Sequence, residues 1–169
     1  MKIFNRLLLL MLSTVLFVPV SFAADAEIKW EDVDSYSDIR PANEVKSRYH
    51  KRIFKELEQH FIELAETLPQ GQSLSIVVTN LDLAGDVRFM VGPNNATVRV
   101  VSDLYFPKMK FDYQLLDETG KVLSTGHANI KDISFNTGHQ SISPDPFHYE
   151  KNMITDWFND EFSQQHAKL

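Results

Sequence analysis

The spacing of apolar side chains predicts one long amphipathic helix between Asn43 and Pro69. Apolar residues recur there at intervals of three or four, and they form a single face made of Tyr49, Ile53, Leu57, Phe61, Leu64 and Leu68. The side chain of Asn43 can cap the first turn, and Pro69 followed by Gly71 ends the helix. Because the stripe is apolar on one side only, we expect this helix to cover a core.

Alternation of apolar and polar positions predicts the strands. Residues 74–78 are largely apolar on both faces, which is typical of a central strand, and we extend that strand to Leu81. Residues 108–116 alternate strictly, so that Met109, Phe111, Tyr113 and Leu115 share one face. Weaker alternation predicts further strands at 27–33, 87–91, 96–101 and 121–130.

The hairpin formed by the last two strands has two permitted registers. A three-residue loop with a glycine bulge places His127 beside Phe111 on the core face. A four-residue loop places His127 opposite Lys110 on the outer face, with Gly126 and Ala128 under the aromatic side chains. We favour the bulged turn and therefore a core-facing histidine.

A second helix is predicted after an aperiodic loop at residues 134–145. Asp145 and Pro146 suit the cap and the first position of this helix. Its stripe is mostly apolar but includes a carboxylate: Glu150, Met153, Ile154, Trp157, Phe158 and Phe162. The fold class predicted is α+β, with a mixed, mainly antiparallel sheet of about five strands and two helices packed on one face. The other face is polar, lined by Arg99, Lys108, Lys110 and Asp112.

The first 23 residues have the pattern of a secretory signal peptide. Lys2 and Arg6 precede an apolar run at residues 7–18, and small residues lead to a cleavage site after Ala23, with cleavage after Ala26 as the alternative. The run is shorter than the roughly 20 apolar residues that cross a bilayer. We therefore expect a single globular domain at 27–165, no membrane span in the mature chain, and a soluble periplasmic protein.

The composition excludes several classes of chemical site and of binding partner. Cysteine is absent, which excludes disulfides, a lipoprotein anchor and cysteine-based metal or redox sites. Removing residues 1–23 takes away two of the 17 basic side chains and none of the 23 acidic ones, so the formal net charge falls from −6 to −8. Such an acidic chain has no general affinity for nucleic acid or anionic lipid. We expect no nucleic-acid partner.

Charges on the long helix run against its dipole. Arg48, Lys51, Arg52 and Lys55 occupy the N-terminal half and glutamates the C-terminal half, whereas a helix dipole favours the reverse order. One interpretation is a solvated face held by pairs such as Arg52–Glu56. The other is a basic docking patch for an anionic partner. We favour the first.

The acidic bend after the central strand resembles a calcium-binding loop but lacks some of the required ligands. Asn80, Asp82 and Asp86 match loop positions of an EF-hand, but Ala84 and Val91 stand where ligands are required. The six histidines show no ligand-pair spacing, and no catalytic or nucleotide-binding fingerprint occurs. We therefore expect no metal site and no cofactor, and we assign no catalytic residue.

Charged side chains around this bend are the candidate binding residues: Asp38, Arg40, Asp82 and Asp86. The function we favour is a non-enzymatic binding or envelope accessory module whose partner is an envelope protein. The alternative is a small hydrolase that uses carboxylate and histidine side chains. It requires Asp38, Arg40, Asp82 or His127 to converge in a pocket.

Several segments together resemble a known family. They are Tyr36-Ser-Asp-Ile-Arg40, Thr79-Asn-Leu-Asp-Leu-Ala-Gly85, Asp117-Glu-Thr-Gly-Lys121 and residues 145–158. In combination they resemble the secreted proteobacterial proteins grouped as domain of unknown function 3016, over residues 28–162. The resemblance implies a single domain in the periplasm of a Gram-negative bacterium and transfers no catalytic residues.

Overall fold

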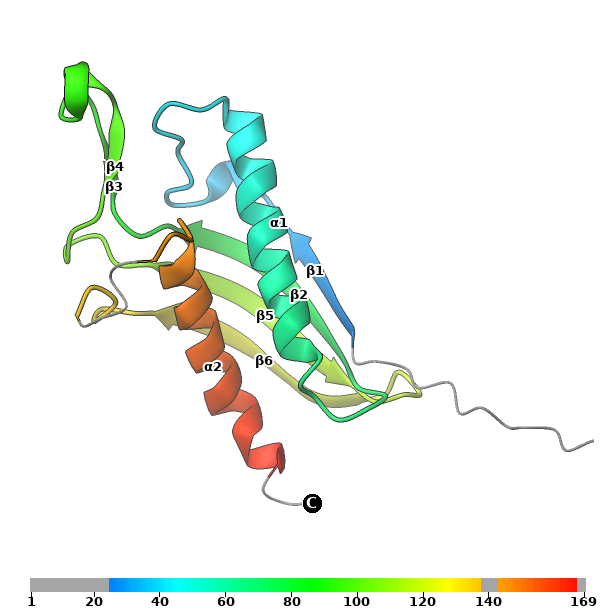
Figure 1. Ribbon diagram of the computed structural model, residues 1–169. Helices are drawn as coiled ribbons and strands as arrows, with labels where there is room; N and C mark the ends of the chain where they lie inside the picture. Colours follow the sequence, from blue (N-terminus) through cyan, green and yellow to red (C-terminus); the bar gives the residue numbers. More distant parts are fainter. Residues whose placement is uncertain (1–24, 138–142, 167–169) are drawn as a thin grey trace, which may run out of the picture.

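The main sheet has four strands in the order β1-β2-β5-β6 (Figure 1). The computed structural model describes residues 25–137 and 143–166, so the predicted signal peptide and part of the predicted 134–145 loop lie outside the described residues. Strand β1 (Asp25–Trp30) is parallel to β2 (Ser73–Asp82), which pairs antiparallel with β5 (Lys108–Leu116). Strand β6 (Val122–Lys131) completes the sheet antiparallel to β5.

Helices α1 (Lys46–Ala65) and α2 (His148–His166) both cover one face of this sheet (Figure 1). The predicted α1 stripe is buried at Tyr49, Ile53, Leu57 and Phe61. Phe111 of β5 packs edge-on against both helices, with ring centroids 5.9 Å from Phe61 and 4.6 Å from Trp157. The predicted α+β class is confirmed, and the core lies between one sheet face and two helices. Within the described residues no helix is long and apolar enough to cross a membrane.

Strands β3 (Asp86–Arg88) and β4 (Val98–Val100) form a separate two-stranded sheet. They project beyond the main sheet near the N-terminal ends of both helices (Figure 1), and we call residues 86–100 the extension. It contains a short 3₁₀ turn at Pro93–Asn95; another lies at Val33–Ser35. The main sheet therefore has one strand fewer than the five expected, and Arg99 is not on its outer face.

The bend at Gly85 explains why the chain leaves the main sheet. Gly85 has a left-handed backbone (φ 81°), which L side chains rarely adopt. A Cβ atom there would lie 2.6 Å from the carbonyl oxygen of Val100, so only glycine lets β4 approach the bend so closely. The chain turns outward at this point.

The favoured register of the β5–β6 hairpin is wrong. His127 pairs with Asp112 on the outer face, and Ala128 pairs with Phe111 on the core face. The ladder does contain a bulge, between Leu115 and Leu116 of β5, but it does not turn His127 inward. Gly126 lies opposite Tyr113, where a Cβ atom would be 2.6 Å from the tyrosine hydroxyl oxygen, so the aromatic ring needs the glycine beneath it.

The two predicted helix caps have different outcomes. Asn43 does not cap α1, because the helix starts at Lys46 without a side-chain cap and the Asn43 amide instead donates to the carbonyl oxygen of Thr97. Asp145 does act as predicted, since its carboxylate accepts from the backbone N–H of Phe147 at 2.9 Å. The regular helix then begins at His148.

Candidate ligand-binding pocket

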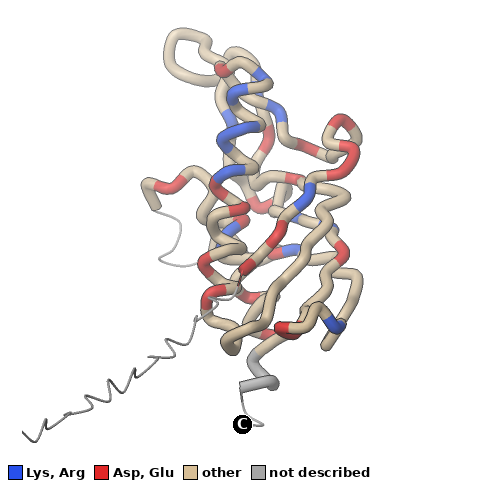
Figure 2. Tube along the Cα trace, turned by 90° about the vertical axis from the view of Figure 1, so that its right-hand side faces the viewer, with Lys and Arg blue, Asp and Glu red and all other residues tan. Residues whose placement is uncertain are grey.

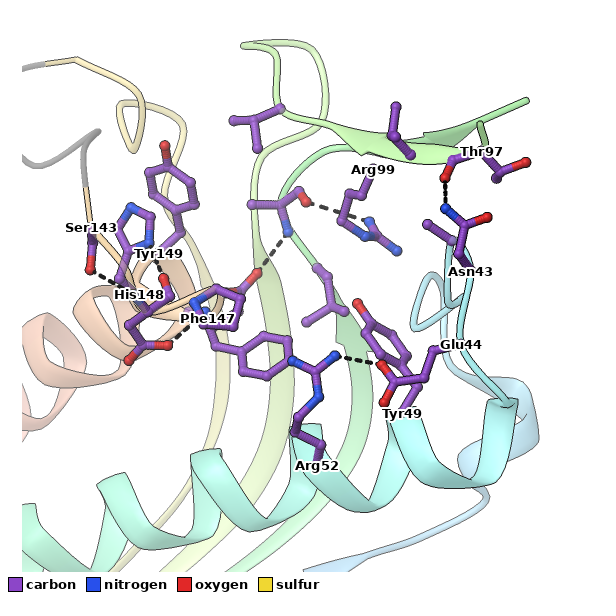
Figure 3. Close-up of a pocket in the computed structure, with 18 of the residues that line it drawn as sticks. Asn43, Glu44, Tyr49, Arg52, Thr97, Arg99, Ser143, Phe147, His148 and Tyr149 are labelled. Carbon is purple, nitrogen blue, oxygen red and sulfur yellow. Dashed lines mark hydrogen bonds and ion pairs between the residues drawn. The ribbon is translucent and has the colours of Figure 1, made fainter. Parts of the chain in front are cut away.

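A pocket of about 830 Å³ lies between the extension and the first turns of both helices (Figure 3). The loop before α1 contributes residues 42–44, and α1 contributes Arg48, Tyr49 and Arg52. The β2–β3 bend contributes Leu83 and Ala84, and β4 with its flanks contributes residues 97–99 and Val101. The remaining wall is the start of α2, residues 145–150, with Ser143. These segments are far apart in the chain, so the pocket depends on the tertiary fold.

Arg99 holds the extension to the rest of the molecule. Its guanidinium donates to the Asp38 carboxylate at 3.1 Å, to the carbonyl oxygen of Gly85 at 2.9 Å and to that of Arg40 at 3.0 Å. The side chain of Arg99 is 17% exposed and that of Asp38 is 11% exposed. This arginine therefore joins three segments at the floor of the pocket.

Three of the four predicted binding residues meet beside Arg99. Arg40 lies 2.9 Å from Asp38 and 2.9 Å from Asp86, which bridges the loop before α1 to the start of β3. Burial on its own raises the pKa of Asp38, but hydrogen bonds from Arg40 and Arg99 outweigh it and hold that pKa below its ordinary value. Asp38 is thus a buried anion shared by two arginines.

Asp82 and His127 lie apart from this group. The Asp82 carboxylate pairs with Lys108 at 2.9 Å, although its backbone bridges to Asp38. His127 is exposed on the outer face of the sheet and contacts Asp112 at 2.7 Å. The four residues proposed for the hydrolase alternative therefore do not converge in one pocket.

Glu150 is a functional candidate that sequence reasoning missed. Its side chain is buried, and one carboxylate oxygen accepts from the backbone N–H of Ala84 at 2.7 Å. Burial raises the pKa of Glu150 despite this hydrogen bond and the nearby charge of Arg99. Its position on the apolar stripe of the second helix was a signal, because a carboxylate on such a stripe must be buried or displaced.

Three buried polar atoms at this pocket have no hydrogen-bond partner among the described residues. They are Nε of Arg99, Oε2 of Glu150 and Nε2 of His148, and all three residues line the pocket. Buried polar groups are normally paired, and an unpaired one calls for an explanation such as a bound water or ligand. Because three such atoms belong to residues of one pocket, this pocket is the candidate binding site.

The arginines of α1 form the opposite wall. The Arg52 guanidinium lies over the rings of Tyr49 and Phe147, at 5.3 and 5.4 Å, and pairs with Glu44 at 2.6 Å. The prediction of an ion pair between Arg52 and Glu56 is therefore wrong. Arg48 lines the same wall and has no ion-pair partner within the described part of the chain.

The electrostatic balance of the pocket is positive. Its acidic lining residues are compensated, since Glu44 pairs with Arg52, Asp145 pairs with Lys151 at 2.7 Å, and burial favours the neutral form of Glu150. The positive ends of two helix dipoles add to the potential. Figure 2 shows basic residues gathered along the upper half of α1. Such a site favours an anion.

No three His, Asp or Glu side chains among the described residues are placed to hold a metal ion. In the acidic bend, Asp82 pairs with Lys108 and Asp86 pairs with Arg40. The carboxylates of the bend thus contact protein cations.

Comparison with known proteins gives one match. The family model described as protein of unknown function (DUF3016) matches residues 24–160, which includes every element except the last turns of α2. No curated protein and no solved structure matches the chain. The family match covers the whole pocket.

Proposed function

We propose that this chain, which belongs to the DUF3016 family, is a soluble periplasmic binding module without catalytic activity that takes a small organic anion into the pocket. The observation that carries the proposal is the set of three buried, unpartnered polar atoms in a positively charged pocket. The signal-peptide pattern of residues 1–23 supports export.

The chemistry of the lining suggests how an anion would be held. Arg48 offers an unpaired cation at the wall, and Arg99 adds a second guanidinium to the lining. The rings of Tyr49 and Phe147 provide apolar surface for the body of the ligand. A site with a few polar groups on an apolar lining is typical of small-molecule pockets.

A small hydrolase is a second candidate, and one observation favours it. Glu150 and His148 line the same pocket, and burial raises the pKa of Glu150 in the direction that suits a general acid. Turnover of nitrophenyl phosphate or nitrophenyl acetate that is lost in Glu150→Gln would favour this function over simple binding.

Calorimetric titration of the exported, processed protein tests the binding proposal. Phenyl phosphate and benzoate are the anionic probes, with benzyl alcohol and benzylamine as neutral and cationic probes of similar size. We expect the anions alone to bind. Intact mass of the same sample, beginning at Ala24, checks the predicted cleavage site.

A matched pair of variants locates the binding. Arg48→Gln removes the unpaired pocket cation and should weaken phenyl phosphate at least about fivefold, since one charge contact is worth about 1 kcal/mol. Lys55→Gln removes an exposed cation of the same helix outside the pocket and should leave the affinity unchanged. Equal binding of neutral and anionic probes, or no effect of Arg48→Gln, would refute the proposal.

A further inference from the structure

The outer end of the extension exposes three consecutive apolar side chains. Phe89, Met90 and Val91 are 72%, 76% and 57% exposed, and we call these residues the tip. Met90 has a left-handed backbone (φ 59°), which is unfavourable for a residue other than glycine. An unfavourable backbone at Met90 and three exposed apolar side chains thus occur together, and this calls for a role outside the fold.

Unpaired cations lie at the same end of the molecule. Arg48, Lys51 and Lys55 are exposed on α1, and none of them has an ion-pair partner within the described residues. Arg48 and Val98 of the extension both line the pocket, so the start of α1 and the extension border the same opening. Figures 1 and 2 place the extension and the basic half of α1 together at the upper end.

We propose that this end of the protein docks on a membrane surface that contains anionic phospholipid. The tip enters the headgroup region, and the cations of α1 contact lipid phosphates. Apolar side chains that project beside a basic surface are the combination that holds proteins at such interfaces. This role goes beyond the proposed function and does not depend on a ligand in the pocket.

Shape and charge favour a lipid surface over a protein partner. A standard protein interface buries about 800 Å² on each side, whereas three side chains on a narrow projection offer a much smaller contact. The predicted net charge of −8 for the mature chain opposes non-oriented binding to anionic lipid. The basic residues gathered along the upper half of α1 oppose that repulsion when the tip approaches first, because charges farther away than about 10 Å are largely screened.

Vesicle co-sedimentation of the mature protein tests the proposal. We expect binding to vesicles of phosphatidylcholine and phosphatidylglycerol in equal parts, weaker binding at high salt, and none to phosphatidylcholine alone. Replacing Lys51 and Lys55 by glutamine should weaken binding about 25-fold, because each cation near an anionic surface contributes about fivefold. The double variant Phe89→Ser, Met90→Ser should weaken it at least about tenfold.

Controls come from the opposite end of the molecule, at the β5–β6 turn (Figure 1). Leu123→Ser and Lys121→Gln change exposed residues of the same types and should leave vesicle binding unchanged. Absence of binding to the anionic vesicles, or equal binding by the tip variant, would overturn the proposal. So would sedimentation of the wild-type protein as a dimer that the tip variant dissociates, since the tip would then be a protein interface. A pocket that binds phenyl phosphate in every one of these cases leaves the proposed function standing.

Discussion

Replacing Arg99 by methionine should destabilise the protein strongly and detach the extension. Methionine keeps much of the length of the side chain but removes the charge and every donor. The Asp38 carboxylate loses its 3.1 Å partner, and the carbonyl oxygens of Gly85 and Arg40 lose donors at 2.9 and 3.0 Å. The Asp38 carboxylate and the Gly85 carbonyl lie where water has limited access, because the Asp38 side chain is 11% exposed and Gly85 is buried.

The expected loss is about 3 kcal/mol of unfolding free energy. A hydrogen bond to a charged group is worth about 1.5–3 kcal/mol, and removing one partner of a buried ion pair costs about 3–5 kcal/mol. Asp38 keeps its second partner, Arg40, at 2.9 Å, which places the loss at the lower end of that range. The carbonyl contacts are not independent of the ion pair, so their contributions are not summed.

Urea unfolding at neutral pH, followed by circular dichroism and by tryptophan fluorescence, measures this loss. With a slope of about 1.5–2 kcal/mol/M, the midpoint should fall by about 1.5–2 M. Arg88→Met is the matched control on the neighbouring strand, because Arg88 is 46% exposed and lies 3.9 Å from Asp86. It should cost less than about 1 kcal/mol. If the two variants differ by less than about 0.5 kcal/mol, Arg99 does not anchor the extension.

Three further predictions concern other buried or constrained positions. Burial raises the folded-state pKa of Glu150, so wild-type stability should decline as pH rises above the ordinary carboxylate range, and Glu150→Gln should abolish that decline in urea midpoints. Burial lowers the pKa of His60, so stability should fall as pH drops below about 6.5, and melting temperatures of His60→Gln should lack this dependence. Gly85→Ala should cost about 2–4 kcal/mol and expose the extension to hydrogen exchange, because the new Cβ meets the Val100 carbonyl oxygen. Gly120→Ala has a similar φ and open space around it, and should cost about 1 kcal/mol.

Local periodicity was sufficient to predict the elements that build the core. The stripe of α1 and the alternation of β5 each decide which side chains are buried, whatever the neighbouring element is. Local periodicity was not sufficient to predict the β5–β6 register, because a bulge can shift the pairing on either side of a turn. The register is the one that places Gly126 opposite Tyr113, whose ring leaves no room for a Cβ atom. This contact joins two strands, so the pattern of one strand alone does not reveal it.

The candidate site was predictable only where its residues lie near the bend. The backbone of Asp38 bridges to the end of β2 and so holds the loop before α1 beside the bend. This is why Arg40 and Asp38 meet Asp86. The alternating pattern of the sequence predicted that Arg99 faces outward from a regular strand. The departure of β4 from the main sheet turns its side chain toward Asp38 instead, and no periodic pattern encodes that departure.

The bend between β2 and β3 is where the core, the pocket and the extension are connected. Its backbone is bound by three different segments: Ala84 N–H donates to Glu150 of α2, Gly85 N–H donates to the carbonyl oxygen of Tyr105, and the Gly85 carbonyl accepts from Arg99. A turn that only reversed the chain would need none of these partners. Glu150 and Arg99 also line the pocket, so two side chains that hold the bend form part of the pocket wall. The particular sequence of the bend therefore serves to place the extension relative to the pocket.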